Sequence, residues 1–308
     1  MSSSSPRKPA GKSRSSATAA AREQARLRRE EQQKKDRRRR MLISIGAPVL
    51  IVILIVVGFV VVKANQKPVA ATGSPSTALD AAAAKSLGSI PAATFDTVGA
   101  GSGVSAPTAV TGAALTADGK PRVVYIGAEY CPFCAAQRWA VVAALSRFGT
   151  FTGLGATTSS SIDSYPSTAT VSFHGATYTS SLLSFTGVEE TTNIPVDASD
   201  ISKGYTPLET PTAADQALVT TYDSQTGSIP FVDFGNKYVT IGASYLPTAL
   251  KGLTQTQIIA DLQNPGSDVA KGALGAANMM TAVLCKMTGN QPAAACSSTA
   301  VTSQKLPA

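Results

Sequence analysis

Two cysteines, Cys131 and Cys134, are separated by two residues in the motif Cys-Pro-Phe-Cys. A thiolate can attack a disulfide bond, and a second thiol one helical turn away can then displace the captured partner as a new disulfide forms. We therefore expect Cys131 to be the nucleophile and Cys134 to be the resolving residue. The motif alone leaves two alternatives open, an inert disulfide and half of a metal site.

The rest of the chain argues against a metal site. A zinc ion in a protein needs several ligands, usually from a second closely spaced cysteine pair or from histidines. The other cysteines, Cys285 and Cys296, are separated by ten residues, and the chain has one histidine, His174, in an expected solvated turn. We expect no metal ion and no other cofactor, and we favour a redox-active pair of cysteines.

The residues around the motif predict a strand followed by a helix. Residues 122–126 form a short apolar run of mostly β-branched side chains, which is typical of a buried strand. From Cys131 onward apolar residues recur at helical spacing, with Trp139 expected in the core and Gly149 just past the end. The cysteines therefore stand where a helix begins, and its positive dipole end favours a thiolate. We expect Cys131 at the exposed tip.

The order of strand, Cys-Pro-Phe-Cys and helix resembles the thioredoxin superfamily. That family carries a cis-proline opposite its cysteines, and here Ile229-Pro230 is followed by a predicted strand, the turn Gly235-Asn236 and a second strand at 238–241. The resemblance implies a thioredoxin-like α/β fold, a cis Pro230, and pairing of the Ile229 backbone with an added substrate strand. The substrate groove implied in this way consists of Tyr130, Pro132, Phe133, Ile229 and Pro230.

Several longer phrases are similar to a second, narrower family. They are YIGAEYCPFCAAQRWA, ALSRFGTF and SIPFVDFGNKYV, together with the late cysteine pair. The family they resemble is an uncharacterised microbial one, catalogued as a domain of unknown function and grouped with thioredoxin-like folds. The likeness covers about residues 90–296. It supports the fold and brings no substrate with it.

Two departures from the thioredoxin pattern concern the site. Many relatives keep a buried acid six residues before the first cysteine, where this chain has Tyr125. Glu129 is nearer to the motif, and we expect it to face the surface, like the pair Glu189-Glu190.

The second departure is an insertion between Cys134 and Pro230, which are separated by 95 residues, far more than a minimal thioredoxin needs. Its pattern predicts β-structure, with strands near 168–173, 176–178 and 182–188, before a helix at 213–222. We expect this β-rich insertion to build a surface that faces the substrate.

Residues 41–62 predict one transmembrane helix. The stretch has 22 residues and no charge, and at ~1.5 Å per residue it reaches about 33 Å, enough for a hydrocarbon core of ~30 Å. Basic residues concentrate before it, so the N-terminus is expected in the cytoplasm. A cleaved signal peptide is the alternative, although it would have a shorter apolar core and a small-residue cleavage site.

Charge is divided unevenly between the two sides of this span. The first 40 residues carry 14 Lys or Arg against 4 Asp or Glu, whereas the other 268 carry 13 against 15. A nearly neutral outer part has no basic footprint for nucleic acid, and the tail is expected to be disordered and to bind anionic lipid headgroups. We expect a tail at 1–40, the span at 41–62, a linker at 63–85 and an extracytoplasmic domain at 86–308.

The C-terminal region predicts two helices, at 254–263 and 267–287. Cys285 lies near the end of the second and Cys296 in the tail, so a disulfide between them would close a short loop. We favour a structural disulfide over a second redox pair that relays electrons to Cys131 and Cys134. Near the other end, Ser76-Thr77 is expected to cap a short helix.

Two functions from different classes remain. The first is a membrane-anchored thiol–disulfide oxidoreductase, an oxidase or isomerase, acting on thiol- or disulfide-containing polypeptides outside the membrane and recycled by an unidentified membrane redox partner. The second is a non-catalytic adaptor of the cell envelope in which both disulfides are structural. The absence of an acid at Tyr125 and the large insertion favour the second, and the Cys-Pro-Phe-Cys motif with Pro230 favours the first.

Overall fold

The computed structural model of the chain describes residues 71–223 and 227–307. The predicted tail and the predicted membrane span at 41–62 lie outside these residues. Among the described helices, none combines the length and the apolar character needed to cross a membrane.

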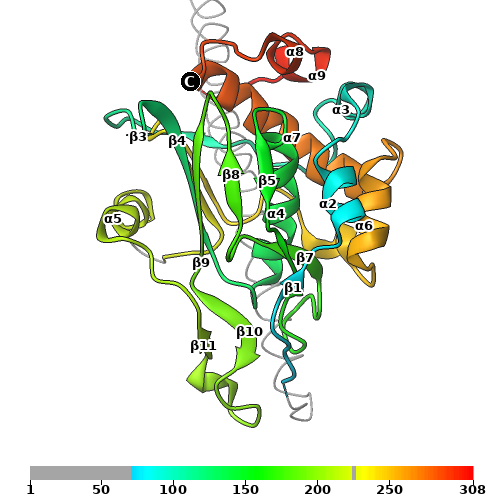
Figure 1. Cartoon of the computed structure of the whole chain (residues 1–308), viewed down its shortest axis with the longest axis vertical. Coiled ribbons are helices and arrows are strands. Elements are labelled where there is room, and N and C mark those ends of the chain that lie inside the picture. Colours follow the sequence, from blue (N-terminus) through cyan, green and yellow to red (C-terminus); the bar gives the residue numbers. More distant parts are fainter. Residues whose placement is uncertain (1–70, 224–226, 308) are drawn as a thin grey trace, which may run out of the picture. The chain divides into compact units, whose positions relative to one another are not determined.

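A mixed β-sheet forms the centre of the described structure (Figure 1). Its middle strand, β4, runs parallel to β9 on one side and antiparallel to β12 on the other, and β13 and β2 continue beyond β12. β3 pairs with the start of β4. The strands are β2 (Thr108–Ala109), β3 (Thr116–Ala117), β4 (Lys120–Gly127), β9 (Ser184–Glu189), β12 (Phe231–Phe234) and β13 (Tyr238–Ile241).

Successive residues of β4 face two different cores. Val123 and Tyr125 belong to a large core shared with most of the helices, whereas Val124 and Ile126 belong to a smaller core that includes Val219. Side chains alternate across a strand, so an unbroken apolar run predicts burial on both faces, and β4 confirms it.

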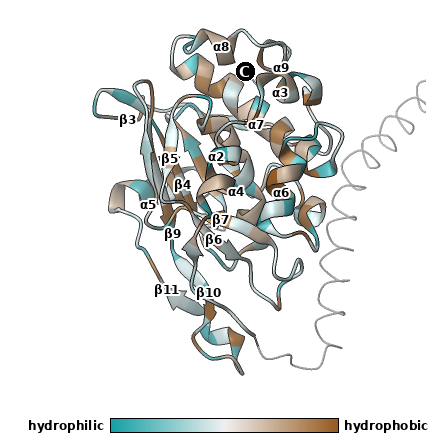
Figure 2. Cartoon of the chain, turned by 45° about the vertical axis from the view of Figure 1, so that its right-hand side comes forward, coloured by the Kyte–Doolittle hydropathy of each residue, from teal (hydrophilic) through white to brown (hydrophobic). Residues whose placement is uncertain are grey.

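Helices cover both faces of the sheet. The large core lies beneath α2 (Ala81–Leu87), α3 (Ala92–Val98), α4 (Pro132–Leu145), α6 (Gln255–Leu262) and α7 (Asp268–Met287). The smaller core is covered by α5 (Ala213–Tyr222), which stands apart from these helices in Figure 1. In Figure 2 residues coloured brown, which are hydrophobic, occur in the strands of the sheet and in helices that lie beside it. The chain is thus a mixed α/β domain with a central mixed sheet and flanking helices, as the coarse part of the prediction required.

The segment between α4 and β12 is rich in strands, as predicted. The predicted strands at 168–173, 176–178 and 182–188 correspond to β7, β8 and β9, and the helix at 213–222 is α5. β10 and β11 form a hairpin that projects from the lower end of the domain in Figure 1. The inserted strands besides β9 are β5 (Thr150–Thr152), β6 (Gly155–Thr158), β7 (Ala169–Ser172), β8 (Thr177–Thr179), β10 (Thr191–Pro195) and β11 (Tyr205–Pro207).

The chain before the first helix also belongs to the fold. Strand β1 (Thr77–Ala78) pairs with β6, and the backbone N–H of Ser74 donates to Oδ1 of Asn193 at 3.1 Å. The expectation that Ser76-Thr77 caps the first helix is wrong. Asp80 caps α2 instead, because its carboxylate accepts from the N–H groups of Ala82 and Ala83.

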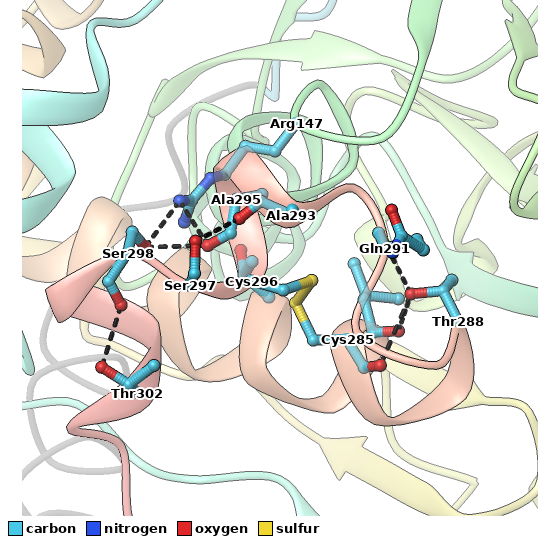
Figure 3. Close-up of a disulfide and its surroundings, with 12 residues drawn as sticks. Arg147, Cys285, Thr288, Gln291, Ala293, Ala295, Cys296, Ser297, Ser298 and Thr302 are labelled. Atoms are coloured by element: carbon cyan, nitrogen blue, oxygen red, sulfur yellow. Dashed lines mark hydrogen bonds between the residues drawn. A yellow bond between two sulfur atoms is a disulfide. The ribbon is translucent and has the colours of Figure 1, made fainter.

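The C-terminal helices follow the prediction closely. The predicted helices at 254–263 and 267–287 are α6 and α7, with Thr254 and Ser267 as N-caps. The chain then forms two short helices, α8 (Ala293–Cys296) and α9 (Thr299–Thr302). The end of α7 is joined to α8 by the Cys285–Cys296 disulfide, drawn in Figure 3. Two short 3-10 helices, Ile201–Lys203 and Pro247–Leu250, complete the described secondary structure.

Candidate functional site

The Cys-Pro-Phe-Cys motif forms the first turn of α4. Cys131 is the N-cap and Pro132 opens the helix, where a missing N–H does no harm. The Sγ atom of Cys131 accepts a hydrogen bond from the backbone N–H of Cys134 over 3.3 Å. Both cysteines are free thiols. One sulfur atom is thus held as an acceptor at the positive end of a helix.

The segment before β12 meets this turn. Because β4 and β12 are antiparallel, with Phe231 opposite Ile126, the end of one and the start of the other share an edge of the sheet. The Ile229–Pro230 peptide bond is cis, as the resemblance implied. The carbonyl oxygen of Ile229 lies 3.9 Å from Sγ of Cys131.

The expectation that Cys131 lies at an exposed tip is wrong. Cys131 is only 6% exposed, and Cys134 is fully buried. Neighbouring aromatic residues belong to a packed cluster: the Tyr130 ring stacks on the ring of Tyr205 in β11, with centroids 4.3 Å apart. The inserted hairpin thus packs directly beside the motif, which sequence spacing could not show.

Two pairs of aromatic rings lie at the motif. We use the name aromatic wall for Tyr130, Phe133, Tyr165 and Tyr205. Phe133 meets Tyr165 edge to face, with centroids 5.7 Å apart. The Tyr205 hydroxyl donates to Oγ of Ser160 at 2.6 Å, and the Ser160 N–H donates to the Tyr130 carbonyl at 2.8 Å. The loop from β6 to β7 and the hairpin β10–β11 therefore fix the surface beside Cys131.

The pKa values of the two thiols are shifted in opposite directions. A hydrogen bond from the Cys134 side chain lowers the pKa of Cys131 below its usual value, and the Cys134 backbone N–H and the charge of Arg138 act in the same direction while burial opposes them. Burial raises the pKa of Cys134 well above its usual value, and Cys131 adds to that increase. The thiolate of the pair therefore belongs to Cys131, the better placed nucleophile.

A buried ion pair lies beneath the motif. Arg138, one turn after Cys134 on α4, donates from Nε and Nη2 to the two carboxylate oxygens of Glu189 at 2.8 Å and 2.6 Å. Both side chains are fully buried. The expectation that Glu189-Glu190 is a solvated pair is therefore wrong for Glu189, because β9 turns this residue toward α4. Burial raises the pKa of Glu189, and Arg138 opposes that increase.

Tyr125 and Glu129 are buried in the same region. Tyr125 is fully buried, its hydroxyl has no hydrogen-bond partner among the described residues, and burial raises its pKa well above the usual value. Glu129 is 1% exposed, which contradicts its predicted surface position. Its backbone N–H donates to the Thr191 carbonyl at 2.9 Å, so pairing with β10 draws the residue inward.

The structure brings the predicted site residues together at one end of the sheet, and adds several that the sequence did not indicate. Arg138 carries a weak signal, since residues four apart share a helix face. Glu189, Tyr165 and Tyr205 carry none, because their proximity depends on tertiary folding of the insertion. Trp139 is a core residue, as predicted, and its Nε1 donates to the Ala169 carbonyl at 3.1 Å.

Two other predicted features lie away from the motif. His174 is at the predicted turn, and its Nδ1 lies 2.7 Å from a carboxylate oxygen of Glu209, so it is ion-paired when protonated rather than simply solvated. Cys285 and Cys296 form the expected disulfide. Over residues 71–223 and 227–307, no three His, Cys, Asp or Glu side chains gather as metal ligands.

Fold and site together define a mixed α/β protein that holds a close pair of buried thiols at the start of a helix. A family model described as Domain of unknown function (DUF929) matches residues 106–286, which is more than half of the chain, and the protein therefore belongs to this family. No curated protein and no solved structure matches the chain significantly.

Proposed function

We propose that this protein is a membrane-anchored thiol–disulfide oxidoreductase with a thioredoxin-like fold, acting on polypeptides outside the membrane. The observation that carries the proposal is the juxtaposition of Cys131 with the cis Ile229–Pro230 bond, whose carbonyl oxygen lies 3.9 Å from Sγ. These residues come from opposite ends of the large insertion, so their meeting is a property of the fold rather than of local sequence.

The arrangement of elements supports the thioredoxin-like part of this proposal. A central strand, β4, leads into the cysteine-bearing helix α4, and the cis-proline segment enters the neighbouring antiparallel strand β12, which turns at Gly235 into β13. A parallel strand, β9, lies on the other side of β4. The β-rich insertion and helix α5 are additions to that arrangement.

The reaction follows from the two thiol acidities. In the reducing direction, the Cys131 thiolate attacks one sulfur of a substrate disulfide, forming a mixed disulfide and releasing the other substrate sulfur as a thiolate. Cys134 then loses its proton and its sulfur attacks Sγ of Cys131, which breaks the mixed disulfide and expels the remaining substrate sulfur as a thiolate. The Cys131–Cys134 disulfide forms, the substrate is reduced by two electrons, and both substrate sulfurs take up protons. Oxidation of a substrate dithiol is the reverse sequence.

The predicted membrane span at 41–62 gives this chemistry its place. Outside the membrane disulfides persist, and a Cys-Pro-Phe-Cys pair there is suited to oxidation or isomerisation of secreted and envelope polypeptides. A membrane redox partner would return the pair to its active state. The basic tail would bind anionic lipid headgroups on the cytoplasmic side.

One experiment tests the proposal directly. The reduction potential of Cys131–Cys134 is measured in glutathione buffers with the full-length chain, alongside insulin reduction and refolding of a reduced, unfolded protein. We expect a reduction potential above about −300 mV, because structural disulfides typically lie below that value. We also expect activity that is lost in Cys131→Ser. A potential at or below that value with neither activity contradicts the proposal. Cys134→Ala should trap substrates on Cys131 for identification.

The adaptor hypothesis draws support from one observation. Cys131 is 6% exposed, and a polypeptide disulfide needs more access than that unless the surrounding side chains move. An adaptor would use the aromatic wall for binding and keep the cysteines inert. An unchanged cellular phenotype in the double variant Cys131→Ser with Cys134→Ser would support the adaptor function. Loss of the phenotype in this variant would support the oxidoreductase function.

A further inference from the structure

Arg138 connects the buried ion pair to the turn that holds the cysteines. Its Nη2 donates to the Ala128 carbonyl at 2.7 Å as well as to Glu189. The same Ala128 carbonyl accepts from the backbone N–H of Cys131 at 3.2 Å. The guanidinium group is thus one shared acceptor away from the first cysteine.

These contacts do not satisfy every N–H group of the Arg138 guanidinium. The side chain is completely buried, and its Nη1 has no hydrogen-bond partner among the described residues. A buried cation with an unpaired N–H group is costly unless nearby negative charge compensates it. Glu189 supplies one such charge. The positive charge also favours the thiolate forms of both Cys131 and Cys134.

We propose that Arg138 is the positioning residue of the redox pair: its buried charge, balanced by Glu189, stabilises the reduced form with a Cys131 thiolate and thereby sets the reduction potential. The inference rests on the oxidoreductase function proposed above and deepens it. In this chain β4 carries Tyr125, and not an acid, six residues before Cys131, and the inference assigns the influence on the thiols to a cation on the cysteine helix.

The direction of the effect follows from the half-reaction. Reduction of the disulfide takes up two electrons and one proton, and it yields the Cys134 thiol and the Cys131 thiolate. Whatever stabilises that thiolate favours the reduced form, and it raises the reduction potential. Glu189 acts against this effect, because its negative charge screens Arg138. Removing Glu189 and removing the whole pair should therefore shift the potential in opposite directions.

Other ionisable groups surround the pair and are held constant in the comparison. Tyr125 of β4 faces the thiols and the guanidinium. In the connection from β4 to α4, Tyr130 faces the thiols and Glu129 faces Glu189. The Glu209 carboxylate accepts from the backbone N–H of Glu189 at 2.8 Å and pairs with His174. The variants are compared at one pH, and the comparison is repeated at a lower and at a higher pH. This separates the titration of these groups from that of Cys131.

Three variants of the full-length chain test the inference. Glu189→Gln keeps the cation and removes its counter-charge. Arg138→Met combined with Glu189→Met removes both charges, which avoids the unpaired buried ion that often unfolds a protein. Arg138→Lys keeps the charge without the two-pronged geometry. The matched control is Arg122→Met with Asp215→Met, because that ion pair, at 2.9 Å, joins β4 to α5 on the other face of the sheet.

The readouts are the equilibrium constant with glutathione and the pH midpoint of Cys131 alkylation. We expect Glu189→Gln to favour the reduced form by about three- to tenfold and the double methionine variant to favour the oxidised form by a similar factor, about 15–30 mV in each direction. Arg138→Lys should stay within about threefold of wild type, and the control pair should shift neither readout.

Two results would overturn the inference. One is an unchanged equilibrium constant and alkylation midpoint in the double methionine variant; the other is a shift in the same direction for Glu189→Gln and the double variant, which a purely structural role produces. Failure of the proposed function looks different. If the wild-type chain does not exchange with glutathione, the function fails, while the alkylation midpoint of Cys131 still reports whether Arg138 stabilises its thiolate.

Discussion

The backbone N–H of Cys134 lies 3.3 Å from Sγ of Cys131 and donates to it. This contact follows from placing Cys131 at the N-cap of α4, since an N-cap side chain accepts from N–H groups of the first turn. The same turn buries Cys134 completely. The thiolate of Cys131 is thus stabilised while Cys134 loses solvation. The difference between the two cysteines arises within one turn of the helix.

Alkylation should reveal this asymmetry. In the reduced full-length chain we expect iodoacetamide to modify Cys131 first, with a pH midpoint below the value of about 8.5 for a free cysteine, because a Cys134 side-chain hydrogen bond lowers its pKa. Cys134, whose pKa is raised by burial, should react only on unfolding. Mass spectrometry of the modified chain measures both. In Cys134→Ala the midpoint for Cys131 should rise, and equal rates for the two wild-type cysteines would refute the expected asymmetry.

The aromatic wall predicts a distinction between large and small substrates. Tyr205→Ala removes the ring stacked on Tyr130 at 4.3 Å, and such pairs contribute about 0.5–1.5 kcal/mol. If the wall binds polypeptides, kcat/KM for insulin should fall by about two- to tenfold, while exchange with glutathione should not fall. Tyr205→Phe keeps the ring and loses only the hydroxyl contact with Ser160, so it serves as the control. A parallel loss of both activities in Tyr205→Ala would argue against a binding surface.

The strand and helix that hold the motif could be predicted because their signals are local. Residues 123–126 form an unbroken apolar run, and residues 132–145 repeat apolar side chains at helical spacing, so β4 and α4 follow from short windows of sequence. The same holds for α5, whose bounds at 213–222 match the prediction. The late disulfide was also within reach, since the chain has only two other cysteines.

The charged layer beneath the motif could not be predicted, because its members are separated in sequence and unremarkable by type. Glu189 and Glu190 are adjacent acids, and only the parallel pairing of β9 with β4 decides that Glu189 points toward Arg138. Glu129 stands in a connection that reads as a surface turn, yet its N–H pairs with Thr191 and the side chain is buried. Burial of such groups is decided by tertiary partners, which a single sequence does not name.

The Cys285–Cys296 disulfide should act on stability alone. It spans eleven positions in sequence and ties α8 to the end of α7, where Arg147 also donates to the Ala295 carbonyl (Figure 3). By loop-closure entropy, Cys285→Ser with Cys296→Ser should lower the free energy of unfolding by about 2–3 kcal/mol. Denaturant unfolding measures this, and insulin reduction serves as the second readout.

The relay alternative makes the contrary prediction for the same double variant. In Figure 1 helix α8, which carries Cys296, lies at the opposite end of the domain from the β10–β11 hairpin, whose Tyr205 stacks on Tyr130 next to Cys131. If electrons passed through Cys285–Cys296, turnover with a membrane redox partner would stop in the variant while a single reaction with substrate continued. Unchanged turnover would leave the disulfide as a structural link.

Asp233 gives the domain a pH dependence of stability. It lies on β12 with no exposed surface, one carboxylate oxygen accepts from the Asn236 N–H at 2.8 Å, and the other has no hydrogen-bond partner among the described residues. Burial raises its pKa from the usual 3.8 to about 6. The folded state therefore binds a proton that the unfolded state has already released. Its stabilising contribution is complete below about pH 4 and is lost as the pH rises through about 6.

Asp233→Asn should remove this dependence, because an amide keeps the acceptor for Asn236 and has no charge to desolvate. Relative to wild type, the free energy of unfolding of the variant should increase by about 2–3 kcal/mol between pH 4 and pH 7. The change with pH is the informative quantity, since the amide leaves a buried N–H group to satisfy and lowers stability equally at every pH. Urea unfolding at a series of pH values measures this change. If the free energy of unfolding varied with pH in the same way for both proteins, the Asp233 carboxylate would have no desolvation cost on folding.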